Sequence, residues 1–359
     1  MSAVATQAAI VRGPAWLARL RHRPVWLGVL GVAALIVVAA AGVMLGTVPV
    51  APADTIAILG HRLVGIPQIV TWPASAETIV WELRLPRVLM ALSVGAGLSL
   101  AGVALQGLLR NPLADPYVLG TASGAALGAA IGILVPVQFA LLGFGLVHVL
   151  AFLGALGAVA VVYRVSRLGG LSSLSSVLLT GYAIGSLLAA GLAITMYLSG
   201  QNLRQIFFYL LGSFSLASWP QIAIGLPIIV IGAAILLTRA RALNALMLGE
   251  ETAAHLGLDV RRERLVLLAT ASLVTAAAVA MAGLIGFVGL VVPHVVRLVA
   301  GPNARSLLPL SAIWGAAFLI VADLIARLPG ELPVGVITGV IGAPFFLLVL
   351  RRYRGGYEL

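Results

Sequence analysis

Apolar stretches long enough to cross a bilayer recur along this chain of 359 residues from Val25 to Leu350, and short arginine-bearing segments separate them. A transmembrane helix needs about 20 predominantly apolar residues. Apolar residues make up 61% of the chain and charged residues 9%, whereas soluble domains are about half apolar and about a quarter charged. The sequence therefore predicts an all-α membrane protein.

Ten spans fit the pattern best, and we expect them to form a single transmembrane domain over residues 1–359. The predicted spans are 25–46, 85–109, 117–135, 138–163, 174–198, 219–239, 264–282, 285–300, 307–326 and 334–350. The polar segments between and beside them are a cytoplasmic start 1–24, outer loops 47–83 and 199–218, an inner loop 240–263, an outer turn 327–333 and a cytoplasmic tail 351–359. Residues 203–211 predict a short interfacial helix within the second outer loop.

The basic residues fix the expected orientation. All 22 are arginine, and with both termini in the cytoplasm only five of them fall outside, namely Arg62, Arg84, Arg87, Arg204 and Arg327. An excess of basic residues in cytoplasmic loops is the usual sign of orientation in helical membrane proteins. Because the arginines are scattered over short loops, the net charge of +11 does not indicate nucleic acid as a partner. Spans two to five begin outside and spans seven to ten begin inside, which favours an inverted relation between them.

Several kinds of chemistry are excluded or disfavoured. Without lysine the chain has no G-x-x-x-x-G-K-[ST] phosphate loop and is not an ATPase by itself. Without cysteine it has no disulfide or thiolate metal site, and we expect no metal site. An ion-coupled carrier usually places carboxylates in mid-membrane, but here the acidic residues lie mostly near span ends. That carrier remains a distant alternative, and an intramembrane enzyme would need a convergent polar cluster.

A series of short blocks lies between residues 80 and 350. The blocks are LRLPR at 83–87, GAG at 95–97, Gly102, Gln106, NPLADP at 111–116, LG at 119–120, GEETAAHLGL at 249–258, GFVGLVVPH at 286–294 with Arg297, ELPVG at 331–335 and GAPFF at 342–346. In identity and order, these blocks resemble the permease subunits of ATP-binding-cassette (ABC) importers for iron chelates and cobalamin, the FecCD type.

The resemblance implies a type II importer permease with ten spans in the bacterial inner membrane. Two copies would form a homodimer with the pathway on its two-fold axis. Two separate ATPase subunits would bind inside and hold ATP and Mg²⁺, and a soluble periplasmic binding protein would dock outside. The chain itself would carry no cofactor and perform no covalent chemistry. For the substrate we favour haem, then a ferric siderophore, with cobalamin as the alternative.

Three outer arginines fall in the resembling blocks or beside them. Arg84 and Arg87 are three residues apart and share a helix face, and Arg327 ends span nine. The resemblance implies that they receive acidic residues of the binding protein. The alternative is interfacial snorkelling, in which a long side chain reaches from the membrane to water.

The resemblance also assigns two inner regions. It identifies a coupling helix that inserts into a cleft of the ATPase, where the alternative is a surface helix at the lipid headgroups and where Gly257 predicts the helix end. It further implies a cytoplasmic gate in two loops, although Asn111-Pro112 could simply end a helix. The coupling residues are Gly249, Glu250, Glu251, Thr252, Ala253, His255, Leu256 and Gly257, and the gate residues are Asn111, Leu113, Ser175 and Ser176.

Two further features have plainer interpretations. His148 lies well inside the predicted fourth span, where it could ligate haem iron, but a lone histidine in an apolar span more often bonds a neighbouring helix. His294 is expected to be structural. Glycines at 120, 124, 128 and 132 form a stripe on one helix face, which predicts close helix packing or movable packing beside a pathway.

Overall fold

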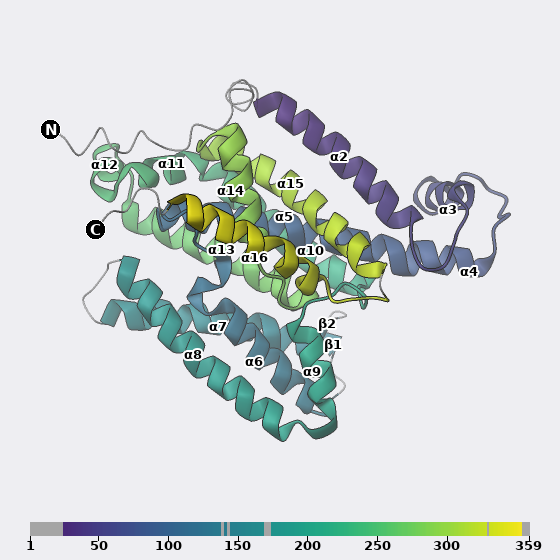
Figure 1. Ribbon diagram of the computed structural model, residues 1–359, viewed down its shortest axis with the longest axis horizontal. Helices are drawn as coiled ribbons and strands as arrows, with labels where there is room; N and C mark the ends of the chain where they lie inside the picture. Colours follow the sequence, from purple (N-terminus) through teal and green to yellow (C-terminus); the bar gives the residue numbers. More distant parts are fainter. Residues whose placement is uncertain (1–23, 138–139, 142–143, 169–173, 329, 354–359) are drawn as a thin grey trace.

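The computed structural model describes residues 24–137, 140–141, 144–168, 174–328 and 330–353, and these are almost entirely helical (Figure 1). Nearly all of the predicted cytoplasmic start and most of the tail lie outside the described residues. Seven helices in the described part are long and apolar enough to cross a membrane. They are α2 (Pro24–Met44), the continuous helix Ala74–Leu108 that contains α5 (Leu85–Leu108), α7 (Leu146–Leu168), α8 (Leu174–Leu198), α10 (Trp219–Thr238), α13 (Val260–Ala282) and α15 (Ala304–Arg327).

Three further apolar helices are α6 (Thr121–Leu134), α14 (Val288–Ala300) and α16 (Val334–Tyr353). Each of these helices overlaps one predicted span in order along the chain. The structure thus confirms a helical, multi-pass membrane protein. Three points stay predictions: that all ten predicted spans cross the membrane, that both ends lie in the cytoplasm, and that the two halves have an inverted relation.

Helix α5 runs through the middle of the bundle, and α10, α13, α14 and α15 all pack against it (Figure 1). Helices α6, α7 and α8 form a neighbouring layer, which reaches the bundle mainly through α13. Helix α2 packs on α15 at the opposite side. Most of α5 and α13 is buried, whereas almost none of α8 is. Helix α8 therefore offers a long apolar face that no other part of the described chain covers.

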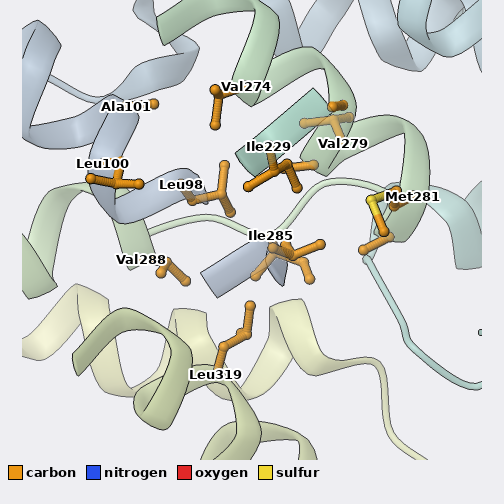
Figure 2. Close-up of a cluster of buried hydrophobic side chains, with 14 of the residues drawn as sticks. Leu98, Leu100, Ala101, Ile229, Val274, Val279, Met281, Ile285, Val288 and Leu319 are labelled. Carbon is orange, nitrogen blue, oxygen red and sulfur yellow. The ribbon is translucent and has the colours of Figure 1, made fainter. Parts of the chain in front are cut away.

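The centre of the bundle is a cluster of aliphatic side chains from separate helices (Figure 2). Leu98 of α5, Ile229 of α10, Val274 of α13 and Leu319 of α15 meet there, each at most 3% exposed. Lipid tails are as apolar as these side chains, so the gain from packing them comes from close van der Waals contact rather than from escaping water. This contact is what makes one arrangement of apolar helices preferable to another.

Glycines allow the closest helix approaches, as the sequence predicted. A Cβ atom added to Gly124 of α6 would lie 2.3 Å from the carbonyl oxygen of Gly154 in α7, and one on Gly128 would lie 2.1 Å from that of Leu150. A Cβ on Gly102 of α5 would lie 1.9 Å from the carbonyl oxygen of Gly289 in α14. Only a residue without a side chain fits at these crossings.

The first outer segment is more ordered than the predicted loop 47–83. It contains α3 (Pro52–Val64), α4 (Ala74–Glu77) and the π-helical segment η2 (Thr78–Arg84), and the last two run into α5 as one helix of 35 residues. Arg62 of α3 pairs with Glu77 of α4 at 2.6 Å, and the Trp72 indole donates to the same carboxylate at 3.2 Å. These contacts join residues 5 and 15 positions apart, and hydropathy averaged along consecutive residues does not register such polar pairs.

The fourth predicted span is also displaced. Helix α7 begins at Leu146 rather than near 138, because the chain first forms a short antiparallel hairpin of β1 (Ala140–Leu141) and β2 (Phe144–Gly145). His148 consequently lies in the first turn of α7 and not in mid-span. The short helix predicted within the second outer loop is present as α9 (Leu203–Leu210), and its interfacial position stays a prediction.

Candidate functional site

Arg84 lies at the end of the bundle that the sequence predicts to face outside, and it is 6% exposed. Its Nη1 donates to the carbonyl oxygens of Val43 at 3.1 Å and Met44 at 2.8 Å, and its Nη2 donates to that of Val48. The last carbonyls of a helix have no partners within the helix and carry partial negative charge. Arg84 therefore caps the end of α2.

Arg87 and Arg327 share one carboxylate. Arg87 Nε lies 3.0 Å from Asp323 Oδ1 and 3.1 Å from Oδ2, and Arg327 Nη2 lies 2.5 Å from Oδ2. The Asp323 side chain is 1% exposed, against 11% for Arg87 and 6% for Arg327. Arg327 also donates to the carbonyl oxygen of Gly42 at 2.8 Å. Buried charges are tolerated when they are paired and hydrogen-bonded in this way.

Glu331 completes this group, which we call the outer arginine cluster: Arg84, Arg87, Asp323, Arg327 and Glu331. Glu331 Oε2 lies 2.7 Å from Arg87 Nη1, and its side chain is 42% exposed. Three arginines and two carboxylates leave the cluster with a net charge of about +1. The three arginines are thus buried and have partners within the chain, rather than projecting freely outward as simple snorkelling would require. Their role in docking stays a prediction.

In the sequence, Asp323 is one of the acidic residues near the ends of predicted spans, and it lies in none of the motif blocks. Asp323 and Arg327 are four residues apart on one helix, a spacing that favours an ion pair and that can be read from the sequence. The contact of Asp323 with Arg87 joins positions 236 residues apart. No local pattern indicated that contact.

The predicted coupling segment forms α11 (Ala240–Leu248) and α12 (Glu250–His255) at the other end of the bundle (Figure 1). Gly249 separates them with a φ of 132°, a backbone conformation that glycine adopts most readily. Gly257 ends α12 in the left-handed region at φ 80°, as the sequence predicted. The Leu258 amide donates to the Ala253 carbonyl and the Gly257 amide to that of Ala254, which is the Schellman arrangement for a helix end.

Helix α12 presents most of its surface outward. Ala253 is its one fully buried residue, whereas Glu250, Glu251, Thr252 and His255 are exposed. Two large apolar side chains flank the helix, Leu248 at 71% exposed and Leu256 at 64%. Arg264 contacts Glu250 at 3.1 Å. A short, anchored helix with exposed polar and apolar side chains has the character of a protein contact surface.

The first predicted gate loop, 111–115, is held by its own polar groups. Asn111 Oδ1 accepts from the Leu113 amide at 2.9 Å, and Asp115 Oδ1 accepts from the Tyr117 amide at 2.8 Å, at the start of η3 (Pro116–Leu119). Burial raises the pKa of Asp115, against the opposing effect of that hydrogen bond. For the second loop, the side chain of Ser175 lies outside the described part, and Ser176 is half-buried near the start of α8. The structure does not bring the two loops into a described contact.

Gln106 is one of the positions that resemble the FecCD family, and the sequence alone suggests no role for it. Pro293 lies inside α14 and has no N–H, so the carbonyl of Gly289, four residues earlier, lacks its usual helical donor. Gln106 Nε2 donates to Gly289 O at 3.1 Å and to Leu290 O at 3.3 Å. Arg297 Nη2 in turn donates to Gln106 Oε1 at 2.7 Å. Gln106 therefore joins α5 to α14 at the point where proline breaks the hydrogen-bond ladder.

His148 bonds a neighbouring helix, as expected for a lone histidine in an apolar span, and His294 packs against an aromatic ring. His148 Nε2 lies 2.9 Å from Gln221 Nε2 of α10, and His294 of α14 meets the Phe345 ring edge-on at a centroid distance of 6.0 Å. Among the described residues, no group of three or more His, Cys, Asp or Glu side chains is placed to hold a metal ion.

The described chain is thus a bundle of apolar helices with a charged cluster at one end and the exposed helix α12 at the other. The model of the FecCD transport family matches residues 34–352. The chain belongs to the FecCD transport family. It is therefore a permease subunit of an ABC importer, and a transport component rather than an enzyme.

Named relatives carry several chelates. The chain is 44% identical over 301 residues to the cobalamin import system permease protein BtuC of Halobacterium salinarum, covering 84% of this chain and 79% of the relative. It is 40% identical over 292 residues to the hemin transport system permease protein HmuU of Yersinia pestis, covering 79% and 87%. It is 36% identical over 340 residues to the Fe(3+) dicitrate transport system permease protein FecC of Escherichia coli, covering 93% and 98%.

A solved structure is also similar. It is described as an inward-facing conformation of a metal-chelate type ABC transporter, and it matches with a TM-score of 0.76 at 32% identity over 90% of this chain and 98% of that one.

Proposed function

We propose that two copies of this chain form the pathway of an importer that carries a metal chelate across the bacterial inner membrane. The family match over residues 34–352 is the observation that supports this most directly. A second copy would cover the apolar face of α8, where Tyr182 and Leu179 are 75% and 71% exposed. Two partner ATPase subunits, which bind ATP and Mg²⁺, would contact α12.

The proposed substrate is a tetrapyrrole-type chelate, either haem or cobalamin. Support comes from the relatives named for cobalamin and hemin, which are 44% and 40% identical, against 36% for the relative named for ferric dicitrate. Both proposed chelates are large metal macrocycles, so one pathway of suitable width could pass either. This preference places cobalamin beside haem, and it leaves a ferric siderophore as the second candidate.

The test is uptake into proteoliposomes by the complex reconstituted with its ATPase subunits and binding protein. Haemin, cyanocobalamin and ferric dicitrate are supplied in parallel, with and without ATP. ATP-dependent uptake of haemin or cyanocobalamin is the expected result. Uptake of ferric dicitrate alone would contradict the substrate class. If none of the three is taken up and the ATPase subunits do not associate, the importer assignment itself is wrong.

The outer arginine cluster is the proposed docking site for the binding protein. The net positive charge of the cluster favours acidic residues on the partner. Glu331, which pairs with Arg87, has a side chain that is 42% exposed and therefore within reach of a partner. Glu331→Gln removes one negative charge, which raises the net charge of the cluster by one, and it should strengthen binding at low salt. Glu82→Gln makes the same change at an exposed outer residue whose side chain has no described place in the cluster. Equal effects of the two substitutions would argue against docking at this cluster.

A further inference from the structure

The inner end of α5 has a charged residue where helices usually place glycine. The Asn111 amide donates to the Gln106 carbonyl at 3.1 Å and the Arg110 amide to that of Gly107 at 3.3 Å, which again is the Schellman arrangement. Arg110 occupies its left-handed position with φ 47°. Glycine, and to a lesser degree asparagine, adopts this conformation most readily. The backbone alone would therefore favour glycine here, so the arginine side chain calls for a separate explanation.

The side chain of Arg110 reaches the segment that precedes the coupling helix. Its Nε donates to the carbonyl oxygen of Leu246, in the last turn of α11, at 3.1 Å. A guanidinium at the end of a helix complements the partial negative charge of the last carbonyls. One turn earlier on α5, a Cβ on Gly107 would lie 2.8 Å from the Leu243 side chain of α11. The end of α5 and the end of α11 are thus packed and hydrogen-bonded together.

Arg110 directly precedes the loop 111–115. Its neighbour Asn111 organises that loop through the Leu113 and Ala114 amides. On the other side, Gly249 alone separates the end of α11 from α12. A displacement of α12 would reach α11 directly, and Arg110 lies between α11 and the loop. No other hydrogen bond described here joins α11 to the residues from 106 to 115.

We propose that Arg110 is a positioning residue that links displacement of the coupling helix to the cytoplasmic gate loop. The inference rests on the proposed function, in which α12 contacts the ATPase and 111–115 forms part of the gate. It adds the connection between them: the guanidinium of Arg110 holds the end of α11 against the end of α5. Import coupled to ATP hydrolysis then depends on the Arg110 side chain and not only on its backbone.

Arg110→Gly tests this sharply, because glycine suits the left-handed backbone and removes only the side chain. The variant complex should assemble and hydrolyse ATP, and it should hydrolyse at least several-fold more ATP per molecule imported than the parent. The imported probe is whichever of haemin, cyanocobalamin or ferric dicitrate the parent carries. Arg110→Asn, which also tolerates this backbone, should behave alike. Arg241→Ala, which removes an exposed arginine of α11, is the control and should stay coupled.

Hydrogen exchange gives a readout that does not need transport. In the assembled parent complex, ATP should change amide exchange in the segment 111–119, and in Arg110→Gly this response should be lost while the response of α12 persists. If Arg110→Gly imports with the parent's ATP ratio and keeps the loop response, its role is only to end a helix and the inference is wrong. If the parent shows no ATP-driven import, the proposed function fails, and the inference fails with it.

Discussion

Replacing Asp323 with asparagine removes the anion that Arg87 and Arg327 share, while it keeps the size of the side chain. The carboxylate is 1% exposed and its two partners are 11% and 6% exposed, so water cannot replace the lost charge. Breaking a buried ion pair at one partner costs about 3–5 kcal/mol. Asparagine keeps one hydrogen-bond acceptor, and we therefore expect the lower end, a loss of about 3 kcal/mol.

Glu331→Gln is the matched control, because it removes the other carboxylate of the same cluster. Its side chain is 42% exposed and forms one contact with Arg87 at 2.7 Å. Exposed ion pairs contribute about 0.2–1 kcal/mol, so this variant should unfold close to the parent. Both are measured by thermal and denaturant unfolding in detergent, followed by the fluorescence of the six tryptophans. Equal losses in the two variants, or a loss below about 1 kcal/mol for Asp323→Asn, would refute the account of the cluster as a buried charge network.

Three further sets of variants test other parts of the molecule. Glu250→Arg combined with Glu251→Arg should weaken ATPase binding by several-fold or more, because like charges at a close contact are strongly unfavourable. Pull-down of the ATPase subunit and substrate uptake measure this, and parental values in both would contradict the coupling role. Asn111→Ala or Leu113→Ala should raise leak of small solutes from proteoliposomes without ATP, and leak equal to the parent in both would leave that loop as a helix end only. Gly102→Ala should destabilise the protein by about 1–3 kcal/mol or more, because its Cβ would lie 1.9 Å from Gly289 O. Gly157→Ala in α7, whose added Cβ would meet no neighbouring element within 4 Å, should be at least as stable as the parent.

The order of apolar helices could be predicted from the sequence, because the length and hydropathy of a span are properties of consecutive residues. The end of α12 also followed from local pattern: Gly257 predicted it, and the left-handed backbone there confirms it. The coupling role of α12 came from the resemblance and stays a prediction. The helical extension before Arg84 could not be predicted in this way. It depends on contacts such as Arg62 with Glu77, which only the folded chain brings together.

The sequence by itself determined the class of membrane protein, because bilayer thickness and charge asymmetry act on each segment separately. Its motif blocks indicated the family and the arginines that lie in or beside them. The tertiary structure decided what those arginines do within the chain: Arg84 caps α2, and Arg87 and Arg327 share Asp323. It likewise decided that Gln106 bonds the carbonyl freed by Pro293 and that Arg110 reaches Leu246 across 136 positions. The physical reason is that apolar spacing cannot specify which helices become neighbours, since one apolar face resembles another. Neighbours are chosen by close packing at glycines and by pairing of buried polar groups, and both require the partner helix to be in place.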